Sequence, residues 1–303
     1  MQIVARESVE GLTAGRHRSI HQGSSIEFRE HRPYVPGDDL KDIDWKVYGK
    51  SDRLYVRQFE DETNLQCTIM IDRSGSMNYA GERAVNLSAV TREGKTSKQD
   101  YATALAAAIA YALLSKQDAV GLLTFDTRIR DSLPPRTRSS HLHALLSVLA
   151  AAHRGGETEL ADVLAAAPAK LPRRGITVLL TDGFGDVSAI GQSLAAMRSR
   201  KQDVMIMQIL DRDEIDFPFN DRIEFRDLER PDQRELVDAR SLKESYLESI
   251  RRHNAALVSI CNQRRIDHVM LTTDEPLVDA LATFLHRRRA LIVGRGAFAR
   301  GGR

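Results

Sequence analysis

The chain reads Cys67-Thr68-Ile69-Met70-Ile71-Asp72-Arg73-Ser74-Gly75-Ser76. A short, mostly apolar run is followed at once by a loop of small polar side chains. Such a run, rich in branched residues, is typical of a strand that a parallel sheet buries on both faces. Runs of the same kind recur farther along the chain, at residues 120–125, 176–180, 204–210 and 268–271.

Amphipathic helical patterns separate these runs. Tyr101, Leu105, Ala108 and Ala112 repeat at the spacing of one helix face. Alternating strands and helices predict an α/β fold with a mostly parallel sheet flanked by helices. Residues 129–133 predict one short antiparallel strand. The further helical patterns lie at residues 139–152, 159–170, 187–200, 241–264 and 276–289.

The composition excludes several classes of protein. Hydrophobic residues make up 42% and charged residues 28% of the 303 residues, which is typical of globular proteins. The formal charge of 44 − 42 = +2 argues against a protein built around nucleic-acid or membrane electrostatics. Two cysteines cannot form a disulfide framework. No apolar run has the roughly 18–20 residues that cross a bilayer, and the first residues lack a signal-peptide pattern, so we expect a cytoplasmic protein.

The chain is expected to divide into three segments. Residues 1–64 form a charged N-terminal segment, residues 65–290 form the α/β domain, and residues 291–303 form a basic tail. Within the domain, residues 78–99 predict a long loop and residues 211–240 a charged insertion. The composition of the tail favours a solvated C-terminus over a nucleic-acid-binding segment, because Phe298 is the only aromatic residue there that could stack on a base.

Oxygen-bearing side chains follow two of the expected strands. Asp72, Ser74 and Ser76 share one loop, Asp182 follows a later strand, and Thr158 stands at the start of an expected helix. Because ligands gather at the carboxyl ends of parallel strands, Asp72 and Asp182 are expected at the same edge of the sheet. Oxygen ligands with few carboxylates suit Mg2+, with Mn2+ or Ca2+ as alternatives. The competing interpretation is that both aspartates only cap helices.

This combination resembles the metal-ion-dependent adhesion site of the von Willebrand factor A-like (Rossmann-like) fold, over roughly residues 65–290. In that fold a carboxylate from a partner protein commonly completes the metal coordination. The interval from Asp72 to Thr158 is longer than is usual for the family, and the loop at residues 78–99 accounts for the extra length. The resemblance implies three hydroxyl ligands and two carboxylates that act directly or through water, namely Ser74, Ser76, Thr158, Asp72 and Asp182.

The N-terminal segment resembles a more specific family within this fold. Residues 27–45, which include Pro36-Gly37-Asp38-Asp39, and residues 54–62 are similar to the signature of the family called domain of unknown function fifty-eight. Members resemble von Willebrand A domains preceded by a short β-rich segment, and they are commonly encoded beside AAA+ ATPases of the MoxR type. Pro36-Gly37 indicates a turn, and Asp38 and Asp39 are expected to cap a short helical turn that holds Ile43 and Trp45.

Three residues near the expected ligands are assigned to a rim that faces a partner. Arg73 carries a positive charge that is unfavourable beside a bound cation, so we expect its side chain to point outward. Glu157 and Asp186 are weaker candidates, because acids at helix starts are commonly solvated or cap the helix.

The leading hypothesis is a non-enzymatic, Mg2+-dependent protein-interaction module, in which a partner's carboxylate takes an open position on the metal. The resemblance implies an adaptor or co-chaperone role with a MoxR-type AAA+ ATPase or its client. One alternative is a metal-dependent hydrolase such as a phosphatase, although the chain has no Gly-X-Ser-X-Gly elbow and no histidine tied to the site by a motif. The other alternative is nucleic-acid or anionic-surface binding through residues 291–303.

Overall fold

The computed structural model describes residues 28–34, 43–59, 66–87, 95–151, 159–228 and 234–300. The described residues divide into two compact units, one within residues 17–64 and the other within residues 65–303. In the smaller unit, the described residues form an antiparallel strand pair and one helix. These elements are β1 (Phe28–Pro33), β2 (Tyr55–Phe59) and α2 (Trp45–Ser51).

The helix of the smaller unit begins later than the sequence motif predicts. Asp44 precedes α2, and its Oδ1 accepts a hydrogen bond from the N–H of Val47 at 3.2 Å, so Asp44 caps the helix. Asp38 and Asp39, to which we assigned the cap, lie outside the described residues. The helix includes Trp45 but not Ile43, which is buried just before it.

A six-stranded sheet runs through the larger unit in the order β10-β7-β6-β3-β4-β5. The first five strands pair in parallel, and β5 is antiparallel to β4. The α/β class, the mostly parallel sheet and the antiparallel strand are therefore confirmed. The strands are β3 (Gln66–Asp72), β4 (Ala119–Phe125), β5 (Ile129–Arg136), β6 (Gly175–Thr181), β7 (Gln202–Leu210) and β10 (Asp267–Thr272).

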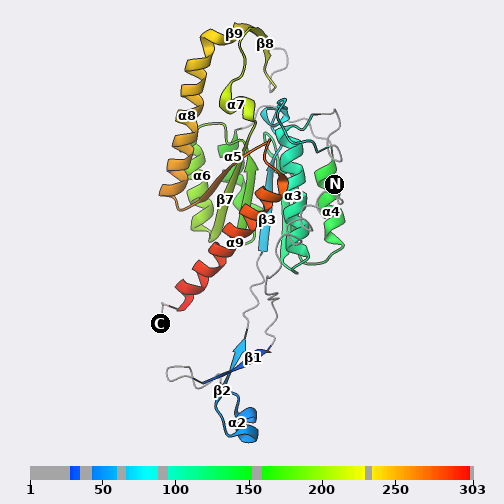
Figure 1. The fold of residues 1–303 in the computed structure, drawn as a ribbon, viewed down its shortest axis with the longest axis vertical. Coiled ribbons are helices and arrows are strands. Elements are labelled where there is room, and N and C mark those ends of the chain that lie inside the picture. Colours follow the sequence, from blue (N-terminus) through cyan, green and yellow to red (C-terminus); the bar gives the residue numbers. More distant parts are fainter. Residues whose placement is uncertain are drawn as a thin grey trace. The chain divides into compact units, whose positions relative to one another are not determined.

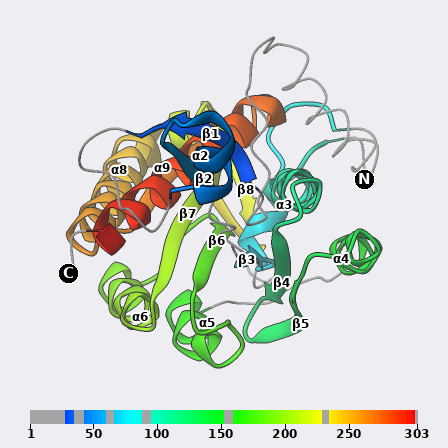
Figure 2. The same ribbon diagram turned by 90° about the horizontal axis from the view of Figure 1, so that it is seen from below.

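Helices cover both faces of the sheet, as Figures 1 and 2 show. Alternate residues of a strand enter different cores, since Ile69 and Ile71 pack with α3, α4 and α9, whereas Met70 packs with α5, α6 and α8. Burial on both faces explains why the strands read as continuous apolar runs. The helices are α3 (Lys98–Leu114), α4 (His141–Ala150), α5 (Leu160–Ala166), α6 (Val187–Ser199), α8 (Ala239–Gln263) and α9 (Leu277–Arg300).

Both expected insertions contain short elements. The first begins with the 3₁₀ turn η2 (Ser76–Asn78) and ends where α3 begins, at Lys98. The second contains α7 (Arg212–Asp216) and an antiparallel hairpin that leads into α8. The hairpin strands are β8 (Arg222–Arg226) and β9 (Arg234–Asp238), and a further 3₁₀ turn, η3 (Ala167–Ala169), follows α5.

The last helix is longer than the sequence pattern predicts. We expected the helix to end near residue 289 and a tail to follow, but α9 continues through Arg300. Arg288, within the part of the helix that we expected, is buried, and its Nη2 lies 2.5 Å from Oδ2 of Asp118, so this arginine anchors the helix to the rest of the unit. No helix in the described part of the chain combines the length and apolar character needed to cross a membrane.

Candidate functional site

Asp72 and Asp182 lie at the carboxyl ends of two neighbouring strands. Asp72 ends β3, Asp182 directly follows β6, and Ile71 and Leu180 are paired across the two strands. The hydroxyl of Thr181 donates a hydrogen bond to Oδ2 of Asp72 at 2.6 Å. Both aspartates are 2% exposed. The fold therefore brings these carboxylates to one sheet edge, where open α/β sheets commonly bind ligands.

The loop after β3 turns its serine hydroxyls toward one another. Oδ1 of Asp72 accepts a hydrogen bond from the N–H of Ser74 at 2.9 Å, which folds the loop back on the strand end. The Oγ atoms of Ser74 and Ser76 are 3.0 Å apart. Four of the five predicted donors thus lie on two adjacent segments. Thr158, the fifth, and Glu157 lie outside the described residues.

Asp72 is in an environment that disfavours its charged form. Burial raises the pKa of Asp72 to about 7, the negative charge of Asp182 adds to the rise, and hydrogen bonds from Thr181 and Ser74 oppose it. Burial and the charge of Asp182 therefore both favour the protonated form of the Asp72 carboxyl. A cation placed between the two carboxylates would favour the charged form.

A buried lysine, which the sequence analysis missed, neutralises part of this charge. Nζ of Lys98 lies 2.9 Å from Oδ2 of Asp182 and 2.7 Å from Oε1 of Glu214, and the lysine side chain is fully buried. It also lies 5.2 Å from the ring centre of Phe184. Burial lowers the pKa of Lys98, but the charges of Asp182 and Glu214 outweigh burial and raise the pKa above its usual value.

A sequence signal for this lysine exists. Lys98 stands three residues before Tyr101 and seven before Leu105, so it falls on the buried face of α3. A lysine on an apolar face needs a carboxylate partner, because an unpaired buried charge is very unfavourable. Glu214 carries no such signal, since it lies in a charged segment without periodicity.

Hydrogen bonds connect Lys98 to a second cluster beyond Glu214. Oε2 of Glu214 accepts from the N–H of Asp211 at 2.7 Å. Oδ2 of Asp211, in turn, accepts from the hydroxyl of Thr273 at 2.7 Å and from the N–H of Gly81 at 3.0 Å. The network thus ties the ends of β7 and β10 to the loop after η2, and it fixes Glu214 for its contact with Lys98.

The structure corrects the expectation for Arg73. We placed this side chain on an exposed rim, but it is 2% exposed. Its guanidinium donates to the carbonyls of Val148 at 2.8 Å, Leu149 at 3.1 Å and Ala151 at 2.9 Å. The last carbonyls of a helix lack partners within the helix, so a cationic donor there is favourable. Arg73 therefore caps α4 and does not face a partner.

Asp186 has a structural role at an exposed position. Its Oδ1 accepts hydrogen bonds from the N–H groups of Ser188 at 2.8 Å and Ala189 at 3.2 Å, so it caps α6. Contact of Asp186 with a partner stays a prediction. Between Asp182 and this cap, Gly183 has a φ of +75°, and a Cβ there would lie 2.9 Å from Leu257, so the turn needs glycine.

The donor set at the sheet edge fits a hard divalent cation. Among the described residues, no three His, Cys, Asp or Glu side chains are placed to hold a metal, so a site here depends on hydroxyls. Carboxylate and hydroxyl oxygens are ligands that suit Mg2+. When Asp72, Asp182 and Glu214 are all ionised, they carry three negative charges against the one positive charge of Lys98, so the formal sum is −3 + 1 = −2. One divalent cation balances this charge.

A family model described as "Protein of unknown function DUF58" matches residues 30–256. Two uncharacterized mycobacterial proteins, Rv1480 of Mycobacterium tuberculosis and Mb1516 of Mycobacterium bovis, are each 24% identical over 298 residues. Each alignment covers 97% of this chain and 90% of the relative.

Three solved structures share parts of the fold. An aerotolerance-related membrane protein from Bacteroides fragilis is 15% identical, with a TM-score of 0.46 over 72% of this chain and 96% of that one. BatB from Bacteroides thetaiotaomicron is 15% identical, with a TM-score of 0.45 over 74% and 98%. The SpRpn10 VWA domain is 11% identical, with a TM-score of 0.40 over 72% and 93%. At these values the likenesses carry no argument about function.

Proposed function

This chain belongs to the DUF58 family of proteins of unknown function, and from the site at its sheet edge we propose that it is a non-enzymatic protein-interaction module. In this proposal it binds Mg2+ and, through the metal, a carboxylate of a partner protein. Mg2+ keeps some of its waters when few carboxylates bind it, so a partner's carboxylate can replace one of them.

The observation that carries the proposal is the convergence of Asp72, Asp182, Ser74 and Ser76 at one sheet edge with an excess of negative charge. The bound cation would supply a positive charge that a partner's carboxylate can reach. The chain's own residues hold the donors in place, since Thr181 orients Asp72 and Lys98 orients Asp182. Thr158 would be the further hydroxyl ligand.

The partner we propose is a MoxR-type AAA+ ATPase or its client, with this chain as adaptor or co-chaperone. The support for this step is the resemblance to a family whose members are commonly encoded beside such ATPases. Fold alone does not assign a partner, so the proposal depends on a direct binding experiment.

The first experiment measures Mg2+ binding by calorimetry and by the shift in the melting temperature. We expect Mg2+ to stabilise the wild-type protein and Asp72→Ala to abolish this response without unfolding the chain. Asp186→Ala is the matched control, because it removes an exposed carboxylate that caps α6 and is not among the proposed ligands. Equal Mg2+ responses in the wild type and in Asp72→Ala would overturn the metal site.

The second experiment measures co-purification of the chain with the ATPase, with Mg2+ and with a chelator. We expect the chelator and Asp72→Ala to weaken the complex to a similar degree. Chelator-resistant binding would show that contact does not use the metal. Metal-dependent hydrolysis of a phosphoester, lost in Asp72→Ala, would instead favour the hydrolase alternative.

A further inference from the structure

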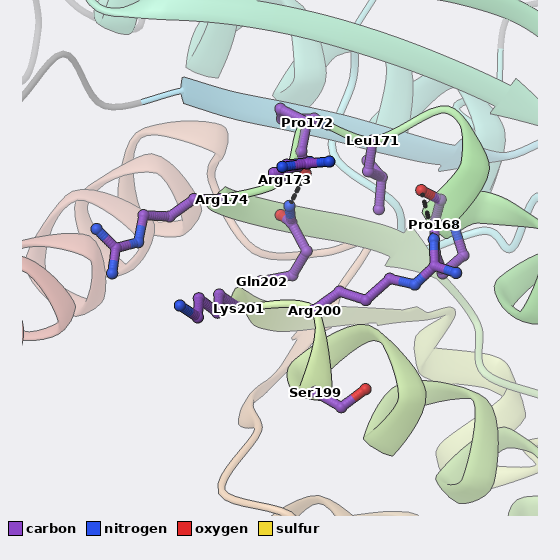
Figure 3. Close-up of a pocket in the computed structure, with 9 residues that line it drawn as sticks. All are labelled: Pro168, Leu171, Pro172, Arg173, Arg174, Ser199, Arg200, Lys201 and Gln202. Atoms are coloured by element: carbon purple, nitrogen blue, oxygen red, sulfur yellow. Dashed lines mark hydrogen bonds between the residues drawn. The ribbon is translucent and has the colours of Figure 1, made fainter.

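A basic pocket lies at the opposite edge of the sheet from Asp72. Its volume is about 520 Å3, and it lies between the segment before β6 and the turn from α6 into β7. Arg174 directly precedes β6 and Lys201 directly precedes β7, so the pocket is at the amino ends of these parallel strands. Four cationic side chains line it, as Figure 3 shows, namely Arg173, Arg174, Arg200 and Lys201.

We propose that this pocket binds a nucleoside phosphate. The proposal does not depend on the metal site, because the two sites lie at opposite ends of β6.

The pocket gathers positive charge without a counter-charge. No acidic residue lines it, and within the described part of the chain none of its four cations has a carboxylate at ion-pair distance. By contrast, Arg198 in the last turn of α6 has a carboxylate partner, because its Nη1 lies 3.4 Å from Oδ1 of Asp203. Figure 3 shows Arg174 and Lys201 extending to one side and Arg200 turning to the other, toward Pro168, so an anionic ligand that spans the pocket would meet positive charge on both sides.

The end of α6 explains only half of this charge. Cations are favourable beside the carbonyls at a helix C-terminus, which accounts for Arg200 and Lys201. It does not account for Arg173 and Arg174, which come from the separate segment after η3. Lys201 also has a φ of 64°, in the left-handed region that glycine adopts more easily. A lysine therefore occupies a position where its backbone conformation is unfavourable, and its side chain lines the pocket.

Hydrogen bonds hold the two sides of the pocket together. Nη1 of Arg200 donates to the carbonyl of Pro168 at 3.3 Å. The buried amide of Gln202 donates to the carbonyl of Pro172 and accepts from the hydroxyl of Thr177 at 3.1 Å. Figure 3 shows Arg200 turned toward Pro168 and Gln202 joined to the opposite segment. The pocket is thus partly preformed, which lowers the entropy cost of binding.

The lining determines the class of ligand. Guanidinium groups match phosphate oxygens with two parallel hydrogen bonds, so three arginines favour a phosphate over a carboxylate. Pro168, Leu171 and Pro172 add an apolar surface on which a planar base can lie. The volume is within the range of pockets that bind small organic ligands. A nucleoside phosphate supplies both the anionic and the apolar part.

The test is calorimetric titration of the full chain with ADP in the presence of a chelator, which keeps the metal site out of the measurement. We expect ADP to bind, pyrophosphate to bind more weakly and adenosine not to bind. The double variant Arg173→Gln/Arg174→Gln and the single variant Arg200→Gln should each weaken ADP binding by about tenfold or more. Arg198→Gln is the matched control, and its affinity should equal that of the wild type.

Four results would overturn the proposal, and three of them come from the ADP titrations. These three are no ADP binding at millimolar concentration, equal affinity for inorganic phosphate and ADP, and equal loss of affinity in Arg198→Gln and Arg200→Gln. Tighter binding of single-stranded RNA than of ADP would overturn it as well. Lys201 is exposed and is not part of the hydrophobic core, so Lys201→Gln should fold normally. The affinity of this second variant for ADP should also be lower than that of the wild type. Asp72→Ala should leave ADP affinity unchanged.

Discussion

Nζ of Lys98 lies 2.9 Å from Oδ2 of Asp182 inside the larger unit, where neither side chain is more than 3% exposed. The first residue of α3 therefore provides a permanent cation to a predicted metal ligand. Glu214 shares this cation at 2.7 Å, so Lys98 neutralises only part of the negative charge around Asp182. This arrangement lets the larger unit bury Asp182 without a metal and still leaves charge for one.

Replacing Lys98 should destabilise the metal-free protein strongly. Lys98→Met leaves Asp182 and Glu214 buried without a cation, and breaking a buried ion pair in this way costs about 3–5 kcal/mol. Mg2+ should then restore more stability to the variant than it adds to the wild type, because binding to the folded state is linked to stability. Denaturant unfolding with a chelator and with Mg2+ measures both effects.

Lys95→Met is the matched control for this prediction. Lys95 lies three residues upstream of Lys98 and pairs with Glu82, but its side chain is 54% exposed. Exposed pairs contribute about 0–1 kcal/mol, so this variant should unfold nearly as the wild type does. If Lys98→Met and Lys95→Met were equally stable, the buried lysine would not act as the counter-ion of Asp182.

The pH dependence of stability should reveal Asp72. Its pKa is raised from 3.8 to about 7 in the folded chain, by burial first and by Asp182 second. The folded state then binds the proton more tightly than the unfolded state, so this contribution to stability is fully present below about pH 4 and is lost as the pH rises to about 7. The raised pKa of Glu214, which burial causes, acts in the same direction.

We therefore expect Asp72→Asn to reduce the decline in stability between about pH 5 and pH 8 in a chelator. The measurement is the free energy of unfolding of both proteins across this range. Asp186→Asn serves as a control, since Asp186 is exposed and lies outside the Asp72–Asp182 pair. An identical pH profile for the wild type and Asp72→Asn would contradict the assignment.

The sequence predicts which carboxylates lie at the sheet edge better than it predicts the residues that contact them. Apolar runs followed by Asp72 and Asp182 suffice to place both carboxylates at the same edge, because parallel strands all end on one side of the sheet. Arg73 was wrongly assigned because its partners are backbone carbonyls at the end of α4, and no side-chain pattern records them. Glu214 was missed for a related reason, since it reaches Lys98 across a sequence separation of 116 residues.

Arg73 should prove to be a structural residue. Arg73→Ala removes the donor to the last carbonyls of α4, and hydrogen bonds from a charged group contribute about 1.5–3 kcal/mol. We expect a loss of stability of that order, measured by denaturant unfolding. Arg128→Ala, at an exposed position after β4, should change stability by less than about 0.5 kcal/mol. A fully stable Arg73→Ala that loses only partner binding would restore the rim assignment.

Gly81 tests the outer part of the network. A Cβ at this position would lie 2.1 Å from Oδ1 and 2.7 Å from Cγ of Asp211, and Asp211 is fully buried. The carboxylate must move in Gly81→Ala, and it then loses hydrogen bonds from Gly81 and Thr273 that hold it in place. The cost of leaving such buried groups unsatisfied is about 1–3 kcal/mol.

Gly49→Ala is the same chemical change as Gly81→Ala, but we expect it to raise stability instead of lowering it. A Cβ at Gly49 meets nothing within 4 Å, and the residue lies in α2 of the smaller unit. Alanine is favoured over glycine in a helix by roughly 0.5–1 kcal/mol, so this variant should be slightly stabilised. Should Gly81→Ala also leave stability unchanged or raise it, Asp211 would have to be free to move. Glu214 would then lack the fixed partner that orients it toward Lys98.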